Sequence, residues 1–222
     1  MQQVAPDAPV KTFAGIIAAK DASTTTETHW FGPDKKLSSH EVASTILLGD
    51  SILAPSKGDK ASDGRPKVAL YLPEDKTLQS EFQSQVGQAF ANSPGAADRA
   101  FQVVKAYYVG KAAKDGRIAA DAKDIDTKIV REAIAATIGA PVDFNGRGEV
   151  LAPWGMDRAT FQDRITTEIR ANAKDIEWGP QRDAAIDSIG LSPAGANSYL
   201  LTMGKGFLRT KDGNPVVIKI AP

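Results

Sequence analysis

Cysteine is absent from the chain, and histidine occurs only twice, at His29 and His40. Without cysteine there is no disulfide, no thiolate nucleophile and no thiolate metal site. Two histidines are too few for most zinc sites, which draw several nitrogen or sulfur ligands from the protein. The sequence therefore excludes cysteine chemistry and argues against zinc, and we predict no cofactor, no metal ligands and no cofactor-binding residues.

An excess of charge of either sign is missing as well. The 27 lysine and arginine residues balance 27 aspartate and glutamate residues, so the formal net charge is zero. A balanced chain without a dense basic run has no global field that attracts nucleic acid or an anionic membrane surface. No apolar run approaches the roughly 20 residues that cross a bilayer. We therefore predict neither a nucleic-acid partner nor a membrane span.

The first 36 residues lack both a sustained hydrophobic period and the marks of a signal peptide. They are rich in proline, threonine and alanine, and no basic segment precedes an apolar one. We interpret 1–36 as an arm or linker with one short helix near 13–19, anchored to the body by Trp30 and Phe31. A single mainly helical domain is predicted over 37–222. The proline-rich segment at the N-terminus suggests that the chain is a piece of a longer protein.

Apolar residues recur every three or four positions over most of the body, which is typical of amphipathic helices. Ser38 and Glu41 have the spacing of a capping box, and the helix that they start either ends at Gly49 or continues to Leu53. Helices are predicted at about 38–53, 77–91, 94–108, 124–138, 157–169 and 180–189. The polar segment 56–66 is predicted to be a mobile loop.

Strand signals occupy three short stretches. The segment 67–73 is interpreted as a short strand or extended run, and Asn145-Gly146 is the turn expected of a hairpin near 142–151. Alternating residues near 197–220 predict a C-terminal antiparallel β-meander. The predicted fold class is therefore α+β, mainly α-helical, with about six helices. One core is expected to contain Phe82, Phe90, Phe101, Tyr108, Ile134, Trp154 and Phe161.

The stretch TILLGDSILAPS contains Gly49-Asp50-Ser51-Ile52, the nucleophile block of the GDS-type esterases. Gly195-Ala196-Asn197 also matches the G-x-N block of their oxyanion hole. A serine nucleophile needs a general base, normally a histidine held by a carboxylate. No histidine follows His40, and a capped helix rather than a strand leads into Ser51. We therefore assign no nucleophile here.

A second motif resembles the catalytic segment of lytic transglycosylases. Asp183 stands near the place of the catalytic glutamate, and Ser192 and Gly195-Ala196 align with the S-x-x-G-A motif that follows it. A glycosidase needs a general acid in a hydrophobic pocket and a cleft for the sugar chain. Too little of the chain follows Asp183 to build such a cleft, so no catalytic residue is predicted.

Trp154 stands in the densest stretch of unusual residues, NGRGEVLAPWGMDRATF. Pro153 and Gly155 flank it, so two stiff or sharp joints hold the indole. The favoured interpretation is that Trp154 fills the core where the hairpin meets the next helix. The alternative is a site for a sugar or a protein partner, because aromatic rings stack on apolar faces.

Three runs of the chain, at 72–116, 131–165 and 198–220, together resemble large virion proteins of tailed bacteriophages and prophages. The resemblance covers about 70–220 and more loosely 37–53. Its most specific residues are Phe82, Gly87, Ala89-Phe90, Tyr107-Tyr108, Asn145-Gly146, Pro153-Trp154-Gly155-Met156, Phe161 and Gly213. These relatives are long, multidomain, structural, internal or tail-associated proteins, and some carry a lytic transglycosylase domain elsewhere. No catalytic residue is carried over from them.

The resemblance implies a non-catalytic structural or accessory domain of a bacteriophage virion-associated protein, with a part in genome delivery or particle assembly. Its partners would be other virion proteins or other domains of the same polypeptide, with peptidoglycan as an additional candidate. It would be made in the bacterial cytoplasm and carried in the phage particle. Two alternatives stay open: a lytic transglycosylase-like enzyme using Glu81, Asp157 or Asp183, and a glycan-binding module using Trp154 and Trp178.

Overall fold

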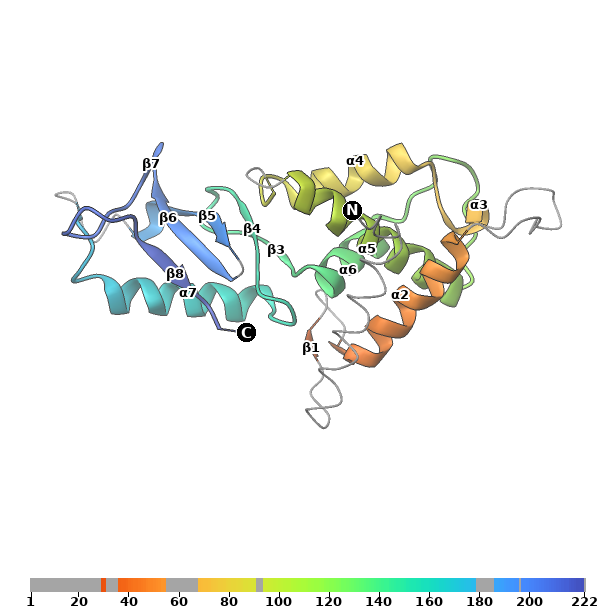
Figure 1. Ribbon diagram of the computed structural model, residues 1–222, viewed down its shortest axis with the longest axis horizontal. Coiled ribbons are helices and arrows are strands. Elements are labelled where there is room, and N and C mark those ends of the chain that lie inside the picture. The colour runs from red at the N-terminus through yellow and green to blue at the C-terminus, as the bar shows by residue number, and fades with distance from the viewer. Residues whose placement is uncertain are drawn as a thin grey trace, which may run out of the picture.

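The computed structural model describes residues 29–30, 36–54, 68–90, 94–178, 186–195 and 197–221. It is α+β and mainly helical, as predicted, with 49% of the described residues in helices. Figure 1 shows two parts side by side, which we call the helical half and the mixed half. The predicted helix at 13–19, the anchoring by Trp30 and Phe31, and the loop at 56–66 lie outside what the structure describes.

The helical half consists of helices and one short strand pair. Its elements are the strand pair β1 (His29–Trp30) and β2 (Lys36–Leu37), followed by α2 (Ser39–Leu53), α3 (Val68–Tyr71), α4 (Asp75–Val86), α5 (Pro94–Lys114) and α6 (Thr127–Thr137). The helix α5 is the longest of the described helices, and α2, α3, α4 and α6 all contact it. It is therefore the centre of this half.

The capping box predicted at the start of α2 is confirmed. The Glu41 N–H donates to the Ser38 Oγ at 3.2 Å, and the Ser38 N–H donates to the Glu41 Oε2 at 2.7 Å. Two of the N–H groups that a helix start leaves unpaired are thereby satisfied. Of the two possible endings, the longer one is correct, because α2 runs through Gly49 to Leu53.

This cap predicts a loss of stability in acid. The hydrogen bond from the Ser38 backbone lowers the pKa of the Glu41 carboxyl below its usual value of 4.5. A lowered folded-state pKa means that the ionised carboxylate stabilises the fold above pH ~4.5 and that this contribution is lost as the pH falls further. Glu41→Gln should thus destabilise the protein at pH 7 but much less at pH 3, as measured by urea unfolding. An equal difference at both pH values would contradict the assignment.

Two predictions in this half are wrong in their boundaries or type. The segment 67–73 was predicted to be a strand or extended run, but 68–71 form the short helix α3, which packs against α5 with Tyr71 and Leu72 against the core. The predicted helix at 77–91 begins at Asp75 and ends at Val86. It stops early because Gly87 has a φ of 47°, which leaves Phe90 in the following turn.

The helices α2 and α5 cross in close contact at two glycines. A Cβ on Gly49 would lie closer than 3.0 Å to the carbonyl oxygen of Ala106, and a Cβ on Gly110 would lie closer than 3.0 Å to that of Thr45. Real Cβ atoms essentially never come this near to backbone atoms. The glycine of the GDSI motif therefore serves helix packing, because no larger residue fits between the two backbones.

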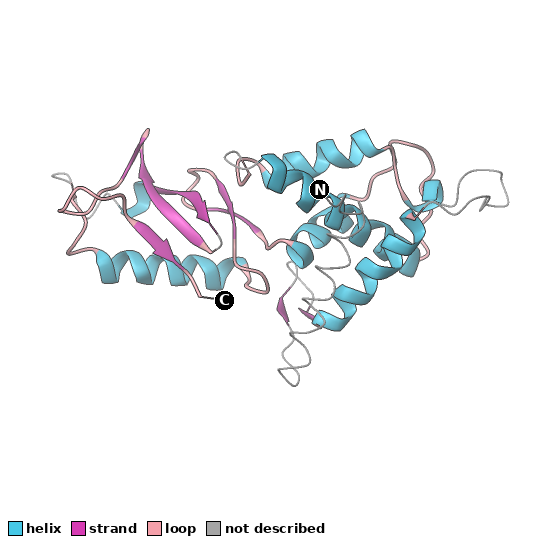
Figure 2. Ribbon diagram, viewed as in Figure 1, coloured by secondary structure: helices cyan, strands magenta, loops and turns pink. Residues whose placement is uncertain are grey.

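The mixed half places one helix against a small antiparallel sheet (Figure 2). Its elements are β3 (Pro141–Asp143), β4 (Glu149–Leu151), α7 (Arg158–Asn172), the 3₁₀ helix η1 (Ile186–Ser188), β5 (Ile189–Gly195), β6 (Ser198–Met203), β7 (Gly206–Phe207) and β8 (Val217–Lys219). The strand β6 is central, because β5 pairs with one edge of it and β7 and β8 with the other.

The hairpin and the C-terminal strands are confirmed. The strand β3 pairs with β4 around a turn in which Asn145 has a φ of 56° and Gly146 a φ of 66°. Both values lie in the left-handed region, which asparagine and glycine tolerate best. The predicted helix at 180–189 is wrong at its end, because Ile189 begins the strand β5. Residues 179–185 lie outside the described ranges.

The expectation of one shared core is wrong for Phe161. The structure has two hydrophobic clusters, one in the helical half and one in the mixed half. Phe82, Phe101, Tyr108 and Ile134 lie in the first, Phe90 and Trp154 pack against it, and Phe161 lies in the second. The Phe161 ring meets Tyr199 of β6 edge-on, with 5.1 Å between the ring centroids. The helical registers are nevertheless correct, since these residues are buried or half-buried.

Candidate functional site

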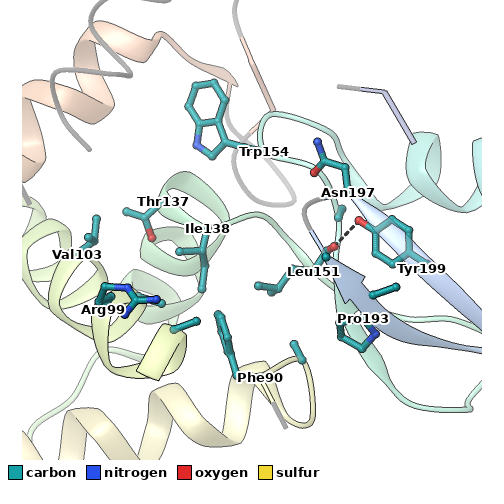
Figure 3. A pocket seen from close by; sticks show the side chains of 16 residues that line it. Phe90, Arg99, Val103, Thr137, Ile138, Leu151, Trp154, Pro193, Asn197 and Tyr199 are labelled. Atoms are coloured by element: carbon teal, nitrogen blue, oxygen red, sulfur yellow. Dashed lines mark hydrogen bonds between the residues drawn. The ribbon is translucent and has the colours of Figure 1, made fainter. Parts of the chain in front are cut away.

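A cavity of about 860 Å³ lies where the helical half and the mixed half meet. Its size is within the range of small-molecule and cofactor pockets, about 300–1,000 Å³. Figure 3 shows side chains from both halves around it. The lining is mainly apolar, with Phe90, Ile138 and Leu151 among its larger aliphatic and aromatic members.

Residues far apart in the sequence form the walls of this cavity. The N-terminal part of α5 contributes Arg99 and Val103, and the end of α6 contributes Thr137 and the following Ile138. The opposite wall comes from β4 and from the turn between β5 and β6, which includes Asn197. The cavity therefore exists only because the two halves are packed together.

Trp154 joins the two halves and also lines the cavity. Its indole is half-buried and packs against the core of the helical half, although the residue follows β4 of the mixed half. The indole N–H donates to the carbonyl oxygen of Ala136 in α6 at 2.8 Å. The two interpretations offered for Trp154 are thus compatible in space, because one face can pack while another part of the ring borders the cavity.

Tyr199 supports the wall opposite α5. Its hydroxyl donates to the carbonyl oxygen of Leu151 at 2.7 Å and so ties β6 to β4 (Figure 3). Burial raises the pKa of the Tyr199 phenol well above its usual value. The phenol therefore stays protonated across the physiological range, which suits a structural hydrogen bond and not proton transfer.

Among the polar side chains that line the cavity, those of Arg99 and Asn197 have no hydrogen-bond or ion-pair partner in the described part of the chain. Neither the Arg99 guanidinium nor the Asn197 carboxamide makes a hydrogen bond or ion pair to a described residue. Arg99 is exposed, whereas Asn197 is half-buried. They lie on opposite sides of the view in Figure 3, with Ile138 and Leu151 between them. These two groups are thus placed to meet the polar parts of a bound molecule.

The residues of the esterase-like pattern do not form a site. Ser51 lies on the exposed side of α2, and its hydroxyl donates to the carbonyl oxygen of Leu48 in its own helix at 2.6 Å. Asn197 of the G-x-N match lies in the mixed half, at the β5–β6 turn. His40 is near the start of the same helix as Ser51. Ser51 is therefore a helix-surface residue with a local hydrogen bond.

The two described acids that were considered for glycoside cleavage have other partners. Asp157 caps α7, where its carboxylate accepts from the N–H and the hydroxyl of Thr160. Burial would raise the pKa of Asp157, but these hydrogen bonds outweigh it and lower the pKa. Glu81 accepts from the side chain of Gln85 in its own helix. Asp183 lies outside the described residues. None of the described residues that line the cavity is an acid.

Trp178 is separate from Trp154. Its indole N–H donates to the carbonyl oxygen of Ala173, just after α7, and its ring packs against the core of the mixed half. It borders a smaller hollow together with Lys174 and Lys211. The two tryptophans suggested for a glycan-binding module therefore do not share one surface cavity.

Charged side chains near the start of α6 form ion pairs with one another and cap the helix. The guanidinium of Arg117 pairs with Asp124 at 2.7 Å and with Asp126 at 3.5 Å, and Asp126 also caps α6. The N–H of Ala120 and the charge of Arg117 lower the pKa of Asp124. Within the described ranges, no group of three or more histidine, cysteine, aspartate or glutamate residues is placed to hold a metal ion.

The cavity was missed at the level of sequence, except for Trp154. Arg99, Ile138 and Leu151 carry no motif, and each looks like an ordinary helix or strand residue. These three residues line the same cavity only because the two halves pack together. The available sequence signal is the presence of Pro153 and Gly155 on either side of Trp154, at the place where the mixed half meets α6.

Comparison with known proteins adds no assignment. No known protein family matches the chain, and no curated protein or solved structure is significantly similar to it. Among the described helices, none combines the length and the apolar composition that a membrane crossing requires.

Proposed function

We propose that the chain is a non-catalytic accessory domain of a bacteriophage virion-associated protein, which binds a neighbouring polypeptide during particle assembly or genome delivery. The neighbour is another virion protein or another domain of the same polypeptide. The resemblance of 72–116, 131–165 and 198–220 to phage virion proteins supports the association with a phage particle.

The apolar cavity between the two halves supports the binding role. Its lining offers buried apolar surface and one cation, but no acid, histidine or serine among the described lining residues. Glycoside cleavage needs a pair of carboxylates, and acyl transfer needs a nucleophile next to a base. A site with this composition suits the burial of apolar groups from a partner, which is the usual way in which proteins gain binding energy.

Association with phage particles tests the setting. After induction of the lysogen or infection by the phage that encodes the chain, particles are banded in a density gradient and analysed by mass spectrometry. We expect peptides of the chain to follow the major capsid protein at a constant ratio across the band. Peptides that stay only in the soluble fraction would overturn the virion assignment.

Incubation with purified peptidoglycan tests the two alternatives. A non-catalytic domain that does not bind glycan should cause no loss of turbidity and should not sediment with the insoluble polymer. Lysis that disappears in Asp157→Asn or Glu81→Gln would establish the enzyme instead. Sedimentation that is lost in Trp154→Phe but kept in Trp178→Phe would establish a glycan site at the cavity.

A further inference from the structure

We propose that the cavity between the two halves binds a short apolar polypeptide segment that carries a carboxylate, with Arg99 pairing with the carboxylate and Asn197 with a peptide group. This inference rests on the proposed function, because it names the chemistry of the partner at the same site. The occupant is a stretch of protein in which an aspartate, a glutamate or a C-terminal carboxylate follows apolar side chains.

The apolar part of the occupant follows from the floor of the cavity. Ile138 and Leu151 lie between the polar groups in Figure 3, and Phe90 and Trp154 border the same space. Water next to such a lining is released when apolar side chains enter, and this release favours binding. The volume of about 860 Å³ leaves room for more than one side chain.

The carboxylate follows from the charge of the lining. Arg99 is the charged member of the described lining, and no described acid balances it within the cavity. A guanidinium presents several N–H donors in a planar fork, a geometry that fits a carboxylate with two parallel hydrogen bonds. Charge complementarity therefore selects an acidic occupant over a neutral or basic one.

The carboxamide of Asn197 favours a polypeptide over a fatty acid. It offers both an N–H donor and a carbonyl acceptor, and no described residue uses either one. A peptide group presents the complementary acceptor and donor, whereas an acyl chain has neither beyond its carboxylate. A fatty acid bound to Arg99 would leave the half-buried carboxamide without a partner.

The test is a selection from a displayed library of random peptides about twelve residues long, carried out on the whole chain. Arg99→Gln removes the cation, Asn197→Gly removes the carboxamide and keeps a residue that tolerates the local φ of 54°. Ala96→Trp and Ala194→Trp each fill the cavity from a different wall. Arg131→Gln is the matched control, because Arg131 is exposed on α6 and does not line the cavity.

We expect the wild type and Arg131→Gln to enrich peptides with an acidic residue close to apolar ones. A synthetic copy of the most enriched peptide should bind up to about fivefold more weakly to Arg99→Gln and about twofold to tenfold more weakly to Asn197→Gly. Replacing the acid in the peptide by its amide should weaken binding to the wild type but hardly change binding to Arg99→Gln. Both tryptophan variants should bind no peptide.

Several results would overturn the proposal. No enrichment, enrichment without acidic residues, or peptides that still bind both tryptophan variants would each contradict it. Dodecanoate that binds the wild type where no peptide does would identify a lipid site instead. Particle association and peptidoglycan lysis are measured separately, so the failure of this proposal can be distinguished from the failure of the proposed function.

Discussion

Replacing Gly110 with alanine should lower the free energy of unfolding by roughly 3 kcal/mol, at the upper end of the range for overpacked cores. The reason is the crossing of α2 and α5, where a Cβ on Gly110 would strike the carbonyl oxygen of Thr45 and approach the backbone nitrogen of Gly49. Both obstacles are backbone atoms, so relief requires the two helices to move apart.

Thermal unfolding followed by circular dichroism measures this effect. At about 2–4 °C per kcal/mol for a chain of this length, Gly110→Ala should lower the Tm by about 6–12 °C. Gly95→Ala is the matched control, because Gly95 lies in the same helix and its added Cβ would meet nothing nearer than an Arg99 side-chain atom at 3.8 Å. That control should leave the Tm unchanged or raise it slightly. Equal losses in both variants would show that the close crossing is not the cause.

Replacing Phe161 with alanine should cost about 3–5 kcal/mol, and the damage should stay in the mixed half. The Phe161 side chain is fully buried in the second hydrophobic cluster, against Tyr199. Because the first cluster is built from other residues, its packing does not depend on this ring. Removal of the ring therefore opens a cavity beneath β6 without loosening α5 or α6.

Hydrogen exchange read by mass spectrometry separates local from global loss. In Phe161→Ala, peptides from α7, β5 and β6 should exchange faster, while peptides from α5 and α6 keep their protection. Phe82→Ala is the mirror variant, since Phe82 is 2% exposed in the first cluster, and it should loosen α4 and α5 instead. Uniform acceleration across the chain in either variant would mean that the two clusters unfold as one unit.

Local chemistry made much of the fold predictable. The capping pair Ser38 and Glu41 and the turn at Asn145-Gly146 act through neighbours in the sequence, and both predictions are confirmed. The apolar stripes of α4, α6 and α7 are confirmed for the same reason, because helical spacing alone determines which side chains share a face.

Features that depend on distant partners were not predictable. The strand β5 was not predicted, because it forms only by pairing with β6, as in the pair Leu191 and Leu201. The sequence of α3 is typical of a strand, and its contact with α5 could not be read from the sequence. Phe161 was expected to share one core with the other large apolar residues, because a spacing pattern shows which residues are buried but not which cluster contains them.

The candidate site depends on such distant contacts even more. Arg99 and Asn197 are almost a hundred positions apart in the sequence, and only the junction at Trp154 brings their elements around one cavity. The motifs that did look catalytic have structural explanations, since Gly49 allows a helix crossing and Asp157 caps a helix. The candidate functional feature is therefore the apolar cavity, whose described lining contains one arginine and no acid.

The indole N–H signals of Trp154 and Trp178 in a ¹⁵N-labelled sample test binding in the cavity most directly. Trp154→Phe and Trp178→Phe assign the two peaks, and the most enriched acidic peptide is then titrated into the wild type. Binding between the two halves predicts that the Trp154 peak shifts and saturates, because this indole borders the cavity and donates to Ala136. The Trp178 peak should stay in place. A peptide that shifts Trp178 and leaves Trp154 unchanged would contradict a binding site between the halves.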